Sequence, residues 1–137
     1  MIVTTVLDFP TKKGEVKDIT EEVRDALQRT SLQSGLVTVF VPGATGGLTT
    51  IEFEAGLIED MEAALQRLAP EDIDYAHNLR WQDGNGHSHI RAALIGPGLS
   101  IPFSQRQLML GTWQQIVFLE LDARPRQRKL VVQIMGE

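Results

Sequence analysis

The run Ile116-Val117-Phe118-Leu119-Glu120-Leu121 is the most strand-like stretch of the chain and decides its fold class. Aliphatic and aromatic residues at this density are typical of a β-strand. Pro125 ends the run, and residues 129–134 form a further strand-like segment. Residues 99–103 form another just upstream, after the Gly96-Pro97-Gly98 turn. Strands joined by short turns predict antiparallel pairing in the second half of the chain.

The first half of the chain adds helices to these strands. Apolar residues recur every three or four positions in two segments, residues 19–27 and 57–68, which predicts two amphipathic helices. Residues 2–7, 36–41 and 48–53 are further strand-like segments. Because helices do not alternate regularly with strands, the pattern predicts an α+β fold rather than a βαβ chain. We expect one domain, residues 1–137.

The composition excludes several functional classes. The 137 residues include no cysteine, which excludes disulfides, thiolate catalysis and iron–sulfur clusters. The formal net charge of −5 argues against a nucleic-acid partner. No signal peptide or membrane-spanning run is visible in the sequence, so we expect no membrane partner and a cytoplasmic location.

All three histidines fall within thirteen residues, at His77, His87 and His89. Residues 83–86 have turn chemistry, and we expect residues 87–95 to form a strand. On a strand, alternate side chains share a face, so His87, His89 and Arg91 would point together. Neutral imidazole is the commonest metal ligand, and the cluster favours a divalent metal site, with zinc as the first candidate. Surface histidines in a polar loop are the alternative.

Three carboxylates are candidate catalytic groups. Glu52 and Glu120 fall within apolar strand segments, where a charge is costly to bury unless it is paired. Each is therefore a candidate base, metal ligand or ion-pair partner, or alternatively a solvent-facing residue of a half-exposed sheet. Asp60 would reach the site only if the second helix packs over the histidine-bearing strand.

Candidate ligand-binding residues follow in the last third of the chain. Arg126 and Arg128 alternate along a strand segment and can hold a phosphate between them, although basic runs also occur as solvated strand edges. Trp113 is typical of a core anchor but can line a ring pocket. Gln114 beside it can orient a ligand amide.

Several short motifs, taken in order, resemble one known family. They are Gly43-x-Thr45-x₆-Glu52, the span from Pro70 to His77, Gly86-His87-Ser88-His89-Ile90-Arg91-Ala92, Gly96-Pro97, Leu110-Gly111-Thr112-Trp113-Gln114, Glu120-x-Asp122 and Pro125-Arg126-x-Arg128. Together they resemble the YjbQ-like family, named for secondary thiamine-phosphate synthase activity, over roughly residues 2–137.

The resemblance implies a compact α+β domain with a β-sandwich core and a homotrimer with sites near subunit boundaries. It also implies a divalent metal held by the histidines and an activity that joins a pyrimidine pyrophosphate to a thiazole phosphate. Two departures from the family pattern bear on that activity: Gly43 stands where many members have histidine, and the stretch from Asp122 to Arg126 is one residue longer.

The leading hypothesis is therefore a metal-dependent enzyme acting on phosphorylated heterocycles. In it, His77, His87 and His89 hold the metal, and Arg126 and Arg128 bind phosphate. Glu120, Asp60 or Glu52 serves as base, a choice that the sequence leaves open. Two alternatives remain: a non-catalytic metal-binding or small-molecule-binding protein, and a metal-dependent hydrolase.

Overall fold

The computed structural model describes residues 1–137 as a single α+β domain with antiparallel sheets, as the sequence predicts. The elements in chain order are β1 (Ile2–Thr11), β2 (Val16–Asp18), α1 (Thr20–Gln28), β3 (Gly35–Phe40), β4 (Gly46–Ile51), α2 (Ala55–Leu68), α3 (Ala76–Trp81), α4 (Gly86–Ile95), β5 (Gly98–Ser104), β6 (Gln107–Leu108), β7 (Gln115–Glu120) and β8 (Arg126–Gly136). The expectation of two helices was wrong, because α3 and α4 add two more. None of the helices has the length and apolarity needed to cross a bilayer.

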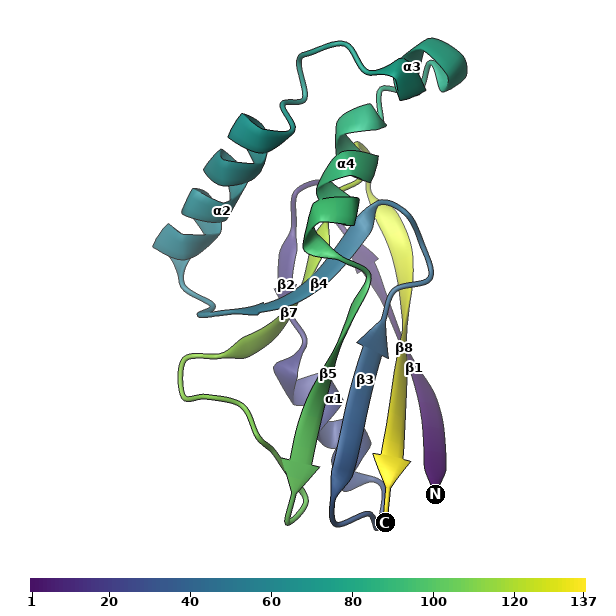
Figure 1. The fold of residues 1–137 in the computed structure, drawn as a ribbon, viewed down its shortest axis with the longest axis vertical. Helices are drawn as coiled ribbons and strands as arrows, with labels where there is room; N and C mark the ends of the chain where they lie inside the picture. The colour runs from purple at the N-terminus through teal and green to yellow at the C-terminus, as the bar shows by residue number, and fades with distance from the viewer.

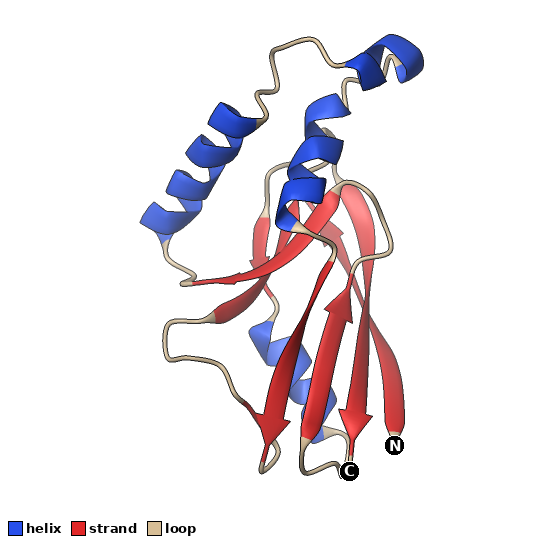
Figure 2. Cartoon of the chain, viewed as in Figure 1, coloured by secondary structure: helices blue, strands red, loops and turns tan.

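The strands form a five-stranded sheet, β1-β8-β3-β5-β6, and a three-stranded sheet, β2-β7-β4. Helix α1 lies behind the five-stranded sheet in Figure 1. Val23 and Leu27 of this helix and Ile19, the residue just before it, are fully buried in the main core, which confirms the four-residue spacing predicted here. Helices α2, α3 and α4 gather at the end of the molecule opposite the two chain termini (Figure 2).

Strand β7 is buried on both faces, and this explains its uninterrupted apolar run. Ile116 and Phe118 point into the main core, whereas Val117 and Leu119 belong to a second cluster with residues of α2 and α4. Alternation along the strand places Glu120 on the same side as Phe118. The strand therefore carries one carboxylate to the end of the main core, where it needs a partner.

Candidate functional site

The segment predicted as a histidine-bearing strand is helix α4, so that prediction was wrong. The turn before it begins a helix, because Asn78 Oδ1 accepts a hydrogen bond from the Gly86 N–H at 2.9 Å. A Cβ at Gly86 would lie 2.5 Å from the Cβ of Tyr75, so the close approach of the two segments requires glycine. The run from 87 to 95 contains two alanines and satisfies a helical as well as a strand pattern, which local periodicity alone does not separate.

Helical geometry sends the histidines of α4 in different directions. Positions 87 and 89 are separated by about 200° around a helix, whereas positions four apart share a face. His87 is accordingly buried together with Arg91, at 3% and 5% exposure, and His89 lies on another side. The shared direction expected for His87, His89 and Arg91 does not occur.

His77 and His89 lie side by side, with their ring centroids 4.3 Å apart. His77 comes from α3, which packs at the start of α4 (Figure 1). The Nδ1 of His77 is buried without a hydrogen-bond partner, and the nearest carboxylate oxygen, Oδ1 of Asp83, is 3.5 Å away. The single chain thus joins two of the three predicted metal ligands, and no group of three histidine, aspartate or glutamate side chains in it is arranged to hold a metal ion.

His87 lies on the wall of a pocket of about 270 Å³ between α2, α4, the end of β7 and the β1–β2 turn. Six of its lining residues are apolar, and seven carry charged side chains. The lining residues are Lys13, Gly14, Glu15, Val16, Ile58, Met61, Glu62, Leu65, Glu71, His87, Arg91, Leu119, Glu120, Leu121 and Asp122. Apolar side chains together with a few polar groups are the usual lining of a small-molecule site.

The Nδ1 of His87 is buried and has no hydrogen-bond partner. Its Nε2 lies 3.4 Å from the Ser88 hydroxyl, at the long limit of a hydrogen bond. Burial lowers the pKa of His87, an effect that nearby Glu71 partly opposes and Arg91 reinforces. The imidazole is therefore neutral near pH 7 and able to accept a proton.

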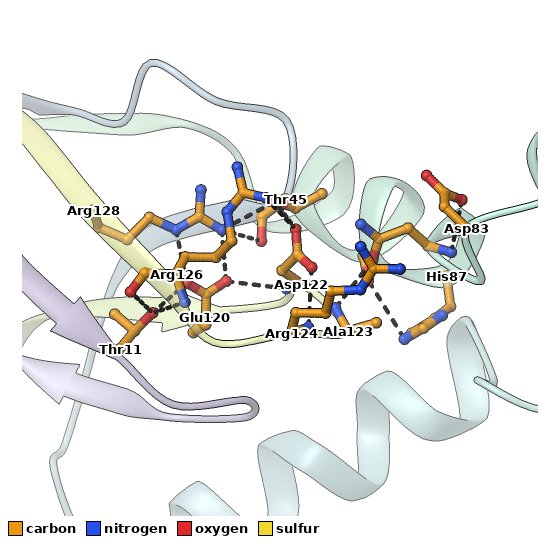
Figure 3. A network of polar contacts seen from close by, with 12 residues as sticks. Thr11, Thr45, Asp83, His87, Glu120, Asp122, Ala123, Arg124, Arg126 and Arg128 are labelled. Carbon is orange, nitrogen blue, oxygen red and sulfur yellow. Dashed lines mark hydrogen bonds and ion pairs between the residues drawn. The ribbon is translucent and has the colours of Figure 1, made fainter. Parts of the chain in front are cut away.

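Glu120 and Arg128 form a buried ion pair beside this pocket (Figure 3). Arg128 Nε donates to Glu120 Oε1 at 2.7 Å, and its Nη2 donates to Oε2 at 2.5 Å. The Thr11 hydroxyl donates to Oε1 at 2.6 Å. The Arg128 guanidinium, which was predicted to bind phosphate, is thus paired with a carboxylate of its own chain. Glu120 is an ion-pair partner, one of the roles that the sequence left open for it.

Asp122 extends this network toward α4 (Figure 3). Its Oδ2 accepts from the Thr45 hydroxyl at 2.9 Å, and its Oδ1 accepts from the Arg124 N–H at 3.0 Å. Burial raises the pKa of Asp122, but the hydrogen bonds from Thr45, Asn85 and the Arg124 N–H outweigh it and hold the pKa below its usual value. Asp122 is therefore an ionised carboxylate next to His87.

The remaining predicted residues lie outside this pocket. Asp60 is exposed on α2, and Glu52 is exposed just after β4 ends. Arg126 is half-exposed, with its Nη1 3.7 Å from Asp122 Oδ2. Trp113 is 73% exposed and is not a core anchor. Gln114 lines a second, separate groove of about 330 Å³ beside β4 and β5, and its Nε2 donates to the Thr50 hydroxyl at 3.0 Å.

The sequence reasoning missed Lys13 and Glu71 as pocket residues. They lie 58 positions apart, and the Lys13 Nζ donates to Glu71 Oε1 at 2.8 Å across the pocket. No local pattern marks either of them, since each is one charged residue in a turn or an irregular segment. Only the folded chain brings them together.

Comparison with known proteins identifies the family. The model described as "UPF0047 protein YjbQ-like" matches residues 5–137. The chain belongs to this family. A UPF0047 protein of Methanothermobacter thermautotrophicus is 36% identical over 126 residues, covering 92% of this chain and 86% of the relative. A UPF0047 protein of Mycobacterium tuberculosis is 40% identical over 119 residues, covering 87% of each chain.

Solved structures of the YjbQ-like family share the fold. A YjbQ-like protein from Sulfolobus solfataricus, described as being of unknown function, superimposes with a TM-score of 0.90 at 28% identity, and all of both chains is covered. A conserved hypothetical protein from Thermus thermophilus gives a TM-score of 0.83 at 33% identity, covering 96% of this chain and 99% of the other. The resemblance seen in the motifs is therefore confirmed at the level of family and fold.

Proposed function

We propose that this YjbQ-like protein is an enzyme that acts on a small phosphorylated heterocycle in the pocket lined by His87. The observation that carries the proposal is the buried, neutral imidazole of His87 with an unpartnered Nδ1, on a pocket lined by both apolar and charged side chains. A pocket of about 270 Å³ suits small ligands rather than a dinucleotide.

The apolar part of the lining suggests how such a substrate would be held. Leu65, Leu119 and Leu121 belong to one apolar cluster with Met61 packed against it, and this cluster offers a surface for a planar ring. The unpartnered Nδ1 of His87 is placed to hydrogen-bond the bound substrate. A neutral imidazole is also a base near pH 7, a role that applies only to a reaction that removes a proton from the substrate. In such a reaction, Asp122 would stabilise the imidazolium, because it stays ionised close by.

The named candidate reaction joins a pyrimidine pyrophosphate to a thiazole phosphate. In it, the thiazole nitrogen bonds to the carbon that bears the pyrophosphate, the carbon–oxygen bond breaks, and pyrophosphate leaves with the bonding electrons. Charge on that leaving group must be met by cations. Arg128 is committed to Glu120 and Arg126 lies outside the pocket, so Lys13 and Arg91 are the cations that line it.

A divalent metal ion is a separate part of the proposal. In one chain the donor set is His77 and His89, one fewer than the three protein ligands of a typical catalytic zinc site. These two ligands do not by themselves fit a closed metal site, and no step of the proposed reaction depends on a metal ion. Elemental analysis of purified protein tests this part: stoichiometric metal lost in His77→Ala and His89→Ala, but kept in His87→Gln, supports it.

We also propose a homotrimer. Support comes from the outer face of the five-stranded sheet, where five large apolar side chains are between 43% and 59% exposed: Ile2, Val6, Leu36, Phe40 and Met135. Exposed apolar side chains gathered on one face are typical of an interaction surface. Sedimentation at micromolar concentration checks it, and a 15.2 kDa species alone would contradict it.

A binding protein without turnover is the second candidate, and one observation favours it. The carboxylates predicted as bases are not free in the pocket: Glu120 is paired, and Asp60 and Glu52 are exposed elsewhere. Catalysis would then depend on His87 alone among the predicted groups.

An assay of the purified protein with the two thiamine precursors, with and without added divalent ion, separates the candidates. We expect His87→Gln to lose turnover while retaining ligand affinity. His89→Gln instead tests whether turnover depends on a bound metal ion. Product formation that is unchanged in His87→Gln would contradict the role assigned to His87. Ligand binding without product in every condition would support the second candidate, a binding protein without turnover.

A further inference from the structure

The carboxylate of Glu71 lies in the charged part of the pocket, opposite cations from two other segments. Lys13, at the tip of the β1–β2 turn, donates to it at 2.8 Å. Both side chains line the pocket. The pair therefore bridges two walls, one from the N-terminal strands and one from the segment that follows α2.

Arg91 approaches the same place from α4. Its Nε donates to the Ala69 carbonyl at 3.0 Å, and its Nη2 donates to Gln66 Oε1 at 2.6 Å. The same Gln66 oxygen lies 3.4 Å from the backbone nitrogen of Glu71. The guanidinium is thus fixed at the base of the segment that carries Glu71.

The electrostatics of Glu71 agree with this geometry. The hydrogen bond from Lys13 lowers the pKa of Glu71 despite the opposing effect of burial, and His87 and Arg91 lower it further. The carboxylate thus lies within electrostatic reach of Lys13, His87 and Arg91, the arrangement in which a phosphorylated ligand would place its oxygens.

We propose that Lys13 and Arg91 form the subsite for the phosphate or pyrophosphate group of the ligand, and that the Glu71 carboxylate occupies this subsite until the ligand displaces it. The proposal rests on the proposed function only in taking the ligand to be phosphorylated. It replaces Arg126 and Arg128 as the phosphate-binding residues.

The Lys13–Glu71 contact is weak enough to be exchanged. The two side chains are 52% and 45% exposed and share one hydrogen bond. Glu71 belongs to the irregular segment between α2 and α3, which can move without unwinding a helix. A phosphate offers more charge and more acceptor oxygens than one carboxylate, so it competes well for the same cations.

Calorimetric titration of the metal-free protein with inorganic pyrophosphate tests the subsite. We expect Glu71→Gln to bind pyrophosphate up to about fivefold more tightly, which at about 1.4 kcal/mol per tenfold matches an exposed ion pair of at most about 1 kcal/mol. Lys13→Gln should bind more weakly than the wild type. Glu15→Gln is the matched control, since it removes the same charge from the same pocket without touching Lys13, and it should give a smaller gain.

Hydrogen exchange supplies a second readout that net charge alone does not change. Among residues 70–75, the Glu71 amide is the one that donates a hydrogen bond, to Gln66 Oε1 at 3.4 Å. Pyrophosphate should accelerate exchange of this amide in the wild type, because the ligand releases the segment. In Glu71→Gln the same amide should exchange fast with or without pyrophosphate.

Equal gains in Glu71→Gln and Glu15→Gln, with no faster exchange in the segment, would overturn the displacement. A pyrophosphate affinity that is unchanged in Lys13→Gln would overturn the subsite. Either failure leaves the proposed function intact if His87→Gln still abolishes turnover. Absence of pyrophosphate binding in every variant, together with absence of turnover, would remove both.

Discussion

Two ion pairs lie on the same pocket and differ in almost every physical respect. The Glu120–Arg128 side chains are 0% and 7% exposed, and Thr11 and Thr45 complete their hydrogen bonds. The Lys13–Glu71 side chains are about half-exposed and share one hydrogen bond. Burial strengthens the charge–charge interaction and makes an unpaired charge costly. The buried Glu120–Arg128 pair is therefore a fixed structural contact, called the brace below, whereas the exposed Lys13–Glu71 pair is exchangeable.

The largest expected effect comes from breaking the buried pair. Arg128→Met leaves Glu120 buried without a counter-charge and should lower the free energy of unfolding by about 3–5 kcal/mol, measured by urea denaturation. Arg126→Met is the matched control on the same strand, since Arg126 is half-exposed and should change stability by less than about 0.5 kcal/mol. Equal losses of stability in the two variants would show that the buried pair stabilises the fold no more than a half-exposed arginine does.

A smaller effect is expected when the brace loses a hydrogen-bonding partner but keeps its charges. Thr45→Val removes the hydroxyl that donates to Asp122 and accepts from Arg128 at 3.0 Å. We expect the loss of about 1–3 kcal/mol, the cost of leaving buried polar groups unsatisfied. Thr38→Val is a suitable control, because its hydroxyl contacts Ser100 on the exposed side of the molecule. A neutral Thr45→Val would mean that water replaces the hydroxyl.

The pH dependence of stability sharpens the comparison at His87. Its pKa in the folded protein is lowered from 6.5, so below pH 6.5 the unfolded chain binds more protons at this residue than the folded protein. This contribution to stability should therefore fall as the pH drops from 6.5 toward the folded pKa, by at most about 1.4 kcal/mol per pH unit. His87→Gln should flatten that part of the curve. An unchanged slope would show that His87 does not cause it.

The smallest expected effect belongs to the exposed pair. Lys13→Gln should change the free energy of unfolding by no more than about 1 kcal/mol, and added salt should shrink the difference, since exposed pairs are screened. Its effect on pyrophosphate affinity should be the larger one. A loss of several kcal/mol would mean that this contact is structural and not exchangeable.

How much of this the sequence predicts depends on the range of each interaction. The helix that carries Ile19, Val23 and Leu27 and the strand at 116–121 were predicted correctly, because a buried face imposes a local period. Residues 87–95 were assigned wrongly, because a short run with alanines and a glycine turn fits two periods. The pairing of His77 with His89 was expected in part, whereas the position of His87 in a separate pocket followed from the helix.

The sequence by itself determined the α+β class, the family and the clustering of histidines, since composition, motif order and local periodicity are properties of neighbouring residues. Only the tertiary structure decided which charges are free. Arg128 of β8 meets Glu120 of β7 after the short connection between these strands. Lys13 meets Glu71 across 58 positions, because the fold places the β1–β2 turn beside the segment that follows α2. The sequence shows which residues are charged. Burial in the fold decides whether a charged side chain stabilises the structure in an ion pair or stays available to a ligand.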